Sequence, residues 1–402
     1  MHLLATSATV GTDYQPYLSF QIIAPPRFRR LGLQTLNRTP QTKKSHNWSW
    51  SIPTAAALLI LVAFSHVVDQ KSPWLLSIAA VLLVGTVFAA VHHAEVVARR
   101  VGPPLGSILL AIAVTVIEVA LIVSVMLASD AYSTGVARDT VFASMMIVLN
   151  GVVGLCLLVG GLRYREQGFQ IRGASGALGV IGTLATLALI LPNYTRSAPG
   201  PVYAPAQLFF VTIISLALYG LFLFVQGIRH REHFLDSEEA IEAEEELPMP
   251  SGSETAISAF LLMVTLSCVI LLAELLTSAV KVGVSLAGLP PTFIGVVIAS
   301  LVLMPEGLSA FRAAHANRLQ TSLNLALGSA LASIGLTIPA ISALSLLLGT
   351  PVTLGLETEH IVLLVLTLFA GSLTLASGRT TVLQGGVHLV IFGAFLTIEA
   401  VP

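Results

Sequence analysis

The sequence predicts an all-α integral membrane protein of about eleven transmembrane helices, arranged as one helix followed by two inverted-topology repeats of five. Three observations predict this class. Charged residues make up only 10% of the chain and hydrophobic residues 55%, whereas a soluble domain carries about 25% charged residues. The apolar segments are continuous rather than alternating, which favours helices over a β-barrel. A segment with one central glutamate also recurs in each half of the chain.

A transmembrane helix needs about 20 mostly apolar residues to cross roughly 30 Å of hydrocarbon. Eleven segments meet or approach this length, and the first, fifth, tenth and eleventh are the shortest. They are residues 54–68, 73–91, 104–128, 140–161, 174–191, 206–228, 256–280, 291–311, 323–348, 360–376 and 381–398. Cys156 and Cys268 lie inside such segments, where we expect small apolar fillers and no disulfide or zinc site.

These segments divide the chain into five parts. Residues 1–50 are expected to form a basic, poorly ordered cytoplasmic tail, and residues 51–72 hold an extra first transmembrane helix. Spans two to six make the first repeat at 73–228, and spans seven to eleven make the second at 256–402. An acidic cytoplasmic loop, 229–255, separates the two repeats.

The acidic loop concentrates seven carboxylates in the stretch DSEEAIEAEEE. Like charges four residues apart disfavour a helix until cations neutralise them. We therefore expect a regulatory element that Ca²⁺ or H⁺ orders against the membrane region. A solvated loop with no such role is the alternative. The carboxylates are Asp236, Glu238, Glu239, Glu242, Glu244, Glu245 and Glu246.

The distribution of Lys and Arg predicts the orientation. With the N-terminus in the cytoplasm, sixteen of the 20 basic residues lie in the tail and the inside loops, and four lie outside. The four outside residues are Lys71, Arg138, Arg196 and Lys281. This bias predicts a multi-pass protein of the plasma membrane, the inner membrane of a bacterium, with its N-terminus in the cytoplasm.

The two halves begin alike. The first reads AEVVARRVGPPLGSILLAIAVTVIEVALI (94–122) and the second reads AELLTSAVKVGVSLAGLPPTFIGVVIASLVLMPEGLSAF (273–311). Each starts with Ala-Glu, passes a Pro-Pro pair and reaches a lone intramembrane glutamate, Glu118 or Glu306. Inverted repeats of this kind place a binding site near the midplane, where the central helices cross. Pro305 is expected to break or kink the second central helix and free carbonyls for a cation.

Two buried carboxylates need a partner, because a charge at the bilayer centre costs at least about 2.5 kcal/mol. No Lys or Arg falls in a predicted span that could pair with them. The acids are therefore either protonated or share a cation. One Ca²⁺ balances two protons at such a site, and Ca²⁺ prefers carboxylate and carbonyl oxygens. We expect Glu118 and Glu306 to bind the cation and the protons alternately, with no catalytic residues and no cofactor.

Weaker candidates surround this pair. Glu95 and Glu274 are placed near the inner ends of spans two and seven, as a cytoplasmic mouth or, equally, as solvated acids at the membrane interface. His388 is a candidate proton relay, with helix packing as the alternative. Small polar side chains could add oxygen ligands or simply pack helices closely. They are Thr115, Ser300, Asn324, Ser329 and Ser333.

The chain resembles the calcium/cation antiporter superfamily from about residue 54 to the end. The most specific stretches are PEGLSAFRAAHANRLQTSLNLALGSALASIGLTIP (305–339) and GRTTVLQGGVHLVIFGAFL (378–396). The resemblance, most marked to bacterial sodium, potassium and calcium–proton antiporters, implies exchange of cytoplasmic Ca²⁺, Na⁺ or K⁺ for protons. It implies central roles for Glu118 and Glu306 and ancillary roles for Glu95 and Glu274.

One departure from the superfamily bears on selectivity. Many relatives carry Gly-Asn-Ala ahead of each central glutamate, whereas this chain has Thr115-Val116-Ile117 and Leu303-Met304-Pro305. The loss of two amide oxygens keeps an alternative open, a K⁺(Na⁺)/H⁺ antiporter with little Ca²⁺ activity.

Other function classes fit the sequence less well. The chain has no HExxH motif and no aspartate within a predicted span, so a membrane enzyme is not expected. An uncoupled cation channel needs no carboxylate protonation, and a receptor leaves the matched acids unexplained. The expected partners are the lipid bilayer and the transported cations and protons. Nucleic acid is not expected, and the sequence predicts no particular oligomeric state.

Overall fold

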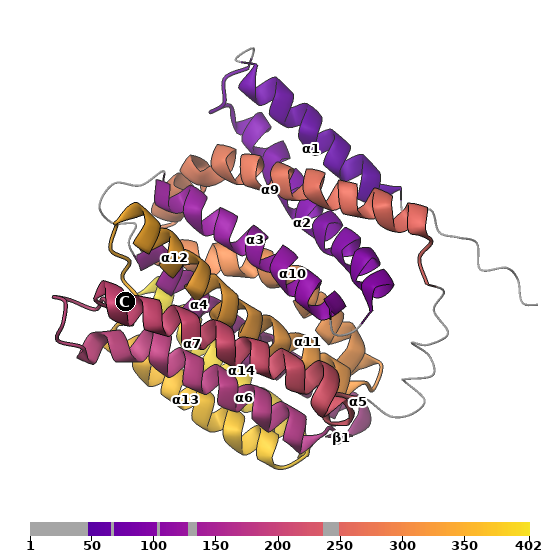
Figure 1. The fold of residues 1–402 in the computed structure, drawn as a ribbon, viewed down its shortest axis with the longest axis vertical. Coiled ribbons are helices and arrows are strands. Elements are labelled where there is room, and N and C mark those ends of the chain that lie inside the picture. The colour runs from indigo at the N-terminus through magenta and orange to yellow at the C-terminus, as the bar shows by residue number, and fades with distance from the viewer. Residues whose placement is uncertain (1–46, 66–67, 103–104, 128–134, 236–248) are drawn as a thin grey trace, which may run out of the picture. The chain divides into compact units, whose positions relative to one another are not determined.

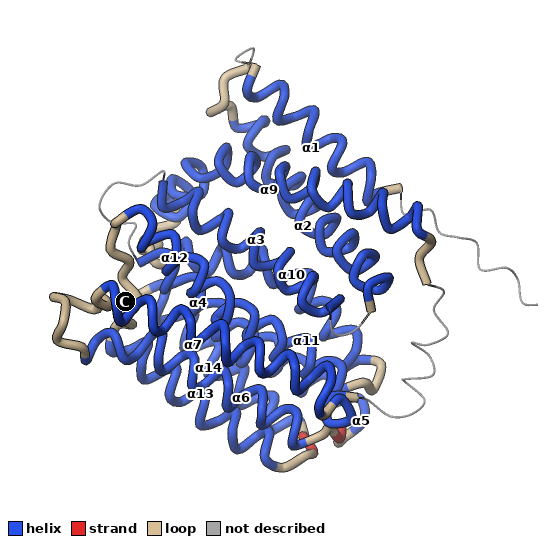
Figure 2. Tube along the Cα trace, in the orientation of Figure 1, coloured by secondary structure: helices blue, strands red, loops and turns tan. Residues whose placement is uncertain are grey.

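The computed structural model describes residues 47–65, 68–102, 105–127, 135–235 and 249–402, and it is almost entirely helical (Figures 1 and 2). The predicted tail lies outside the described residues, except that residues 48–50 already belong to the first helix. All seven carboxylates of the acidic loop also lie outside them.

The elements of the first half run from the first helix to a short turn after α7. They are α1 (Trp48–Phe64), α2 (Pro73–Val101), α3 (Leu105–Leu127), α4 (Val136–Met146), η2 (Ile147–Val152), α5 (Val153–Tyr164), β1 (Gln167–Gly168), α6 (Ile171–Ala185), η3 (Thr186–Ile190), η4 (Leu191–Tyr194), α7 (Pro205–Phe224), η5 (Val225–Arg229) and η6 (Arg231–Phe234). The second half comprises α9 (Gly252–Leu286), α10 (Phe293–His315), α11 (Leu319–Ala332), η7 (Ser333–Thr337), α12 (Ile338–Leu348), α13 (Thr358–Ala376), β2 (Arg379–Thr380) and α14 (Val382–Ala400).

Ten helical stretches of the described chain are long and apolar enough to cross a membrane. Several join consecutive elements, such as Val136–Tyr164 and Leu319–Leu348. The predicted first span corresponds to α1, an apolar helix of 17 residues, which is shorter than the others. The all-α membrane fold predicted from composition and apolar runs is therefore confirmed.

The two halves enter the bundle in opposite senses. The end of α2 lies beside the start of α9, where the Arg100 guanidinium donates to the Pro250 carbonyl at 3.5 Å. Helices α1, α2 and α9 lie side by side at one edge, and α3 and α10 lie next to them (Figure 1). Beyond these, α5 packs on α14 and α6 packs on α13.

One end of the bundle collects the loops that follow α5 and α13, with Arg163 in the last turn of α5 and Arg379 in β2. Tyr164 donates to the His315 carbonyl at 2.9 Å, and β1 pairs with β2 through Gln167 and Thr380. These loops, together with the α2–α9 junction, are those that the charge count assigns to the cytoplasm, and we call this side the basic end.

Close helix packing requires a glycine where α14 crosses α5. A Cβ atom at Gly385 would lie 2.4 Å from the backbone nitrogen of Leu158. The neighbouring Gly386 has nothing within 4 Å of the same position. The small residue thus brings the two backbones together, as is common between membrane helices.

The prediction of a broken helix at Pro305 is wrong. Helix α10 continues through Pro305 from Phe293 to His315. The backbone irregularities instead lie on neighbouring helices, as the π-helical segments η2 and η7. A π segment locally widens the helix and is frequent at functional sites. The π-helical distortions η2 and η7 therefore lie on helices that pack against α3 and α10, and α10 itself is continuous.

Candidate functional site

Glu118 lies at the centre of α3 and is only 2% exposed. Three hydroxyl groups donate to its carboxylate. Ser144 on α4 and Ser333 on η7 donate to Oε1 at 3.2 and 2.6 Å, and Thr337 on η7 donates to Oε2 at 2.5 Å. Ser333 and Thr337, four residues apart in η7, lie on the same face of the helix and reach the same carboxylate. Buried polar groups need such partners, so the carboxyl is held in place without a basic residue.

Glu306 has a different environment. Its carboxyl lines a cavity of about 300 Å³, and the Oε2 atom has no hydrogen-bond partner. The cavity is bordered by the first half of α3, by α11 and by the segments after α7. We call it the Glu306 cavity. Its polar lining residues are Gln226, Arg318, Thr321, Asn324 and Ser329.

The fold brings the helices of the two central glutamates together, although 188 positions separate these residues in the sequence. Glu306 is within electrostatic reach of both Glu118 and Glu95. The fold therefore gathers three carboxyl groups between α2, α3 and α10. One is occluded, one faces a cavity, and Glu95 is exposed near the basic end of α2.

The structure brings some of the weaker candidates to this site and not others. Ser333 contacts Glu118, and Asn324 and Ser329 line the Glu306 cavity. Thr115 instead lines a separate cavity, and Ser300 is exposed to the surroundings of the bundle. Neither position brings a hydroxyl to the central carboxylates in this conformation, so the geometry favours the helix-packing alternative for Thr115 and Ser300.

His388 lies in a separate buried cluster. Its Nδ1 contacts Asn150 Oδ1 and its Nε2 contacts Thr374 Oγ1, each at 3.1 Å, and Asn150 also donates to Thr367 at 2.9 Å. Among the described residues, the hydrogen bonds of His388 involve neither central glutamate. The geometry therefore favours the helix-packing alternative over the proton relay. The cluster ties η2 to α13 and α14.

The placement of Glu274 beside the cytoplasmic mouth is wrong. Glu274 lies 22 residues after the start of α9 at Gly252, which is about 33 Å along a helix. Because Gly252 lies near the end of α2, Glu274 sits in the opposite half of the bundle from Glu95. There it lines a cavity of about 680 Å³ with Thr115 and Ser124 of α3. We call this the Glu274 cavity.

The two cavities therefore divide along α3. The Glu306 cavity is lined by Leu110, Ala111 and Val114, and the Glu274 cavity is lined by Thr115, Val116, Val119, Ala120, Val123 and Ser124. Glu118 itself lines neither. A carboxylate that is closed off between two openings has the position that an alternately accessible site requires.

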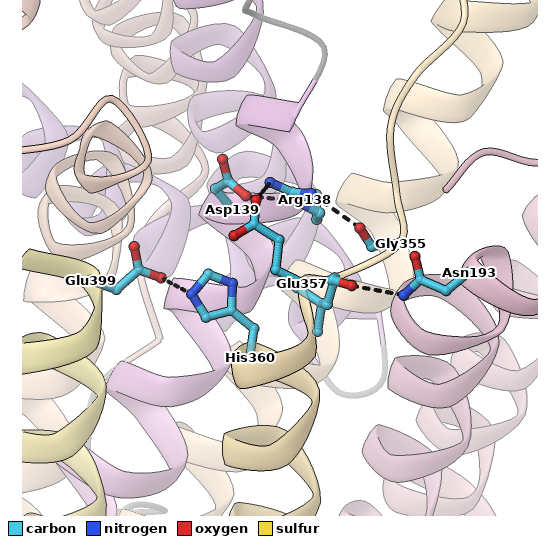
Figure 3. A network of polar contacts seen from close by, with 8 residues as sticks. Arg138, Asp139, Asn193, Gly355, Glu357, His360 and Glu399 are labelled. Carbon is cyan, nitrogen blue, oxygen red and sulfur yellow. Dashed lines mark hydrogen bonds and ion pairs between the residues drawn. The ribbon is translucent and has the colours of Figure 1, made fainter. Parts of the chain in front are cut away.

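Sequence reasoning missed a charged network at the end opposite the basic end (Figure 3). Arg138 donates to Asp139 Oδ1 at 2.7 Å and to the Gly355 carbonyl at 3.1 Å, and it pairs with Glu357 at 3.6 Å. Nearby, His360 and Glu399 form a pair at 3.1 Å, and both side chains are at most 5% exposed. The network joins α4, α13, α14 and the loop before α13.

These charges were missed because they sit at predicted helix ends. Asp139 immediately precedes the predicted span 140–161, and Glu399 immediately follows 381–398. The helices are longer, so the expectations that no aspartate lies in a span and that Arg138 lies in an outside loop are both wrong. Among the described residues, the ion-pair partners of Arg138 are Asp139 and Glu357, and neither central glutamate is one of them.

Comparison with protein families decides the assignment. Two stretches of the chain, residues 71–228 and 257–401, match the family described as sodium/calcium exchanger protein. The chain belongs to the sodium/calcium exchanger family. Glu95, Glu118, Glu274 and Glu306 all fall within the matched stretches.

Relatives of known sequence cover the whole membrane region. The protein y4hA of Sinorhizobium fredii, named as an ionic transporter, is 51% identical over 88% of this chain and 96% of its own length. The sodium-potassium/proton antiporter ChaA of Escherichia coli is 32% identical over 90% of this chain and 98% of its own.

Solved structures share the exchanger-family fold. The native structure of YfkE superposes with a TM-score of 0.67 at 18% identity, covering 88% of this chain and all of that one. The H⁺/Ca²⁺ exchanger CAX superposes with a TM-score of 0.64 at 14% identity, covering 89% of this chain and 90% of that one. At these identities the likeness establishes the fold alone.

Proposed function

We propose that this exchanger-family protein is a secondary active antiporter that exchanges a cytoplasmic metal cation for protons at Glu118 and Glu306. The observation that carries the proposal is that Glu118 is buried and lines neither cavity, while Glu306, within electrostatic range of it, faces the Glu306 cavity. Among the described residues, the ion pairs of Arg138 and Arg379 involve other carboxylates and neither central glutamate. Proton antiport by the ChaA relative supports the same assignment.

The chemistry follows from charge compensation. Two carboxylates side by side in a low-dielectric interior repel each other, so the pair is stable only with protons or a cation bound. Protons and cation therefore compete for the same oxygens. Coupling results because each ion can leave toward one side only after the other has arrived from the opposite side.

The two cavities supply the routes. The path from the basic end is lined by Glu306, with Glu95 within electrostatic range of it. We assign this end to the cytoplasm because the Lys and Arg residues gather there. Glu274 lies on the opposite path, in the half of α3 beyond Thr115. We assign the N-terminus to the cytoplasm and the protein to the bacterial inner membrane on the same grounds.

The cation is a hard ion, because every side-chain ligand around Glu118 is an oxygen. Ca²⁺ takes six to eight oxygens, and two carboxylates with three hydroxyls approach that number. We therefore propose Ca²⁺ as a substrate, with Na⁺ or K⁺ also carried. The competing candidate is K⁺(Na⁺)/H⁺ exchange with little Ca²⁺ transport. Two observations favour this competing candidate. The described hydrogen-bond donors to Glu118 are hydroxyls and include no amide group, and the chain is 32% identical to ChaA.

The seven carboxylates between Asp236 and Glu246 remain a proposed regulatory element that bound Ca²⁺ or H⁺ would order. Shortening this run should change activation of exchange and leave the central site intact. The run lies outside the described residues, so the proposal rests on its charge pattern alone.

The test uses the purified protein in liposomes with an imposed pH gradient. Addition of Ca²⁺, Na⁺ or K⁺ should collapse the gradient in the wild type, and Glu118→Gln and Glu306→Gln should each abolish the response. Glu166→Gln, at a partly exposed carboxylate of the basic end, is the matched control and should exchange normally. Wild-type rates in either central variant would refute the two-carboxylate site.

The same assay separates the substrates. Collapse with Ca²⁺ supports calcium–proton exchange, whereas collapse with only K⁺ or Na⁺ selects the competing candidate. Cation flux that proceeds without proton movement would indicate an uncoupled channel.

A further inference from the structure

A cluster of metal-binding side chains lies outside the membrane region, in the turn that follows α7. The segment RHREHF contains His230, Glu232 and His233, and η6 spans Arg231–Phe234. Glu232 Oε1 lies 3.4 Å from His230 Nδ1 and 3.8 Å from His233 Nε2. One ligand atom from each residue lies within 4.8 Å of the others.

The geometry is close to that of a bound metal ion. Three ligands held at about 2.1 Å around a tetrahedral ion lie about 3.4 Å apart, so the cluster needs only small side-chain movements. The two imidazole rings are already stacked, with centroids 5.1 Å apart and planes inclined by 10°. The side chains are 23 to 66% exposed, which leaves room for water at a fourth position.

The charge at the cluster also suits a cation. The cluster combines one carboxylate with two imidazole groups, all of them partly exposed. Imidazole ligands favour zinc, nickel and copper, whereas Ca²⁺, Na⁺ and K⁺ favour oxygen ligands. The cluster would therefore bind a different class of ion from the one proposed for Glu118.

The backbone of the same turn closes one side of the Glu306 cavity. Phe234 and Leu235 line this cavity together with Glu306. The Phe234 carbonyl accepts a hydrogen bond from Asn324 of α11 at 2.5 Å. The His233 carbonyl lies so close to α6 that a Cβ at Gly173 would be 2.3 Å from its oxygen. The turn is thus wedged between α6 and α11, with its carbonyl groups on the helices and its ligand side chains outward.

We propose that His230, Glu232 and His233 form a regulatory site for a divalent transition-metal ion of the zinc type, and that the bound ion holds η6 over the Glu306 cavity and slows exchange. The second part rests on the proposed antiport function, because it requires ions to reach Glu306 through this cavity. The first part concerns binding alone and is independent of transport.

Binding is tested on the full-length protein in detergent, by titration of Zn²⁺ against a chromophoric chelator. We expect one Zn²⁺ site, and His230→Gln and His233→Gln should each lower its affinity by roughly tenfold or more. Removing a residue that only hydrogen-bonds to a metal ligand already lowers metal affinity by about 10- to 100-fold, and these variants remove a ligand itself. His315→Gln, at another exposed histidine of the basic end, is the control and should bind Zn²⁺ as the wild type does. Equal Zn²⁺ affinity in the wild type, His230→Gln and His233→Gln would overturn the site.

Coupling to transport is tested in liposomes with and without Zn²⁺. We expect Zn²⁺ to slow exchange by the wild type and by His315→Gln but not by His233→Gln, and all three to exchange equally without Zn²⁺. Zinc binding at these residues with unchanged exchange would overturn the gating role. A wild type that exchanges no cation at all would refute the proposed function, and the chelator titration would still decide the metal site.

Discussion

Ser333 Oγ donates a 2.6 Å hydrogen bond to Glu118 Oε1, although 215 positions separate the two residues. Thr337 reaches the other oxygen of the same carboxylate from one helical turn further along η7. The central glutamate of the first half is thus held mainly by hydroxyls of the second half. A movement of α11, η7 and α12 relative to α3 would break these bonds, so the hydrogen bonding of Glu118 depends on the relative position of the two halves.

The first prediction concerns these hydroxyls. Ser333→Ala and Thr337→Val should each raise the cation concentration needed for half-maximal exchange by about tenfold, because a hydrogen bond to a charged group contributes about 1.5–3 kcal/mol. The maximal rate should change less, since both carboxylates remain. The measurement is the cation dependence of pH-gradient collapse in liposomes.

Ser372→Ala is the control for this pair. Ser372 is exposed on α13 and donates only to the Phe369 carbonyl within its own helix. An unchanged half-saturation in Ser333→Ala and Thr337→Val would mean that Glu118 does not rely on these donors when the cation is bound.

Much of this site follows from the sequence. The two acids were found because an ionisable residue in the middle of an apolar segment is costly, and the matched Pro-Pro spacing paired them. Ser333 was among the candidates as a small polar residue in a span. Thr337, which makes an equally short contact, was not, although its spacing of four residues from Ser333 places both on one helix face and could have found it.

The remaining errors have a common physical cause, which is that apolar runs do not show where helices end or which face they present. Helix α4 begins at Val136, four residues before its predicted start, and so includes the buried Asp139. Ser300 and Ser333 are equivalent as small polar residues in spans, yet only Ser333 faces a carboxylate. Facing direction is set by tertiary packing and by π segments such as η7, neither of which leaves a composition signal.

The second prediction uses accessibility. A cysteine at Ser329, which lines the Glu306 cavity, should react with a membrane-impermeant thiol reagent added from the cytoplasmic side. A cysteine at Ser144, 1% exposed beside Glu118, should react far more slowly. The native Cys156 and Cys268 are buried and provide the unreactive background. Labelling of the cysteine at position 329 only from the opposite side of the membrane would reverse the proposed orientation.

The third prediction concerns the contact between α5 and α14. Gly385→Ala should lower the free energy of unfolding by about 1–3 kcal/mol, because its methyl group would overlap the Leu158 backbone and force the helices apart. Gly386→Ala is a matched control, since the adjacent position is open. Thermal unfolding of the purified protein measures both. Equal melting temperatures for the two variants would show that the helices can separate without loss of packing energy.

The fourth prediction concerns the buried pair of His360 and Glu399. Glu399 is 2% exposed, and its Oε2 atom has no hydrogen-bond partner among the described residues. Its Oε1 atom contacts His360 Nε2 at 3.1 Å. Removing one member of a buried ion pair typically costs about 3–5 kcal/mol, because the other is left without compensation. His360→Leu should therefore lower the melting temperature strongly.

The double variant His360→Leu/Glu399→Gln distinguishes pairing from packing. If the cost arises from an uncompensated carboxylate, the second substitution removes that charge, and the double variant should be more stable than His360→Leu alone. If the cost arises from the His360 ring packed 4.8 Å from Phe142, the second substitution should give no recovery. Glu359→Gln, at a half-buried position in the first turn of the same helix, should lower the melting temperature far less than His360→Leu, because the amide that replaces its carboxylate still reaches water. Recovery in the double variant would show that this end of the bundle is held by charge compensation, as the central site is proposed to be.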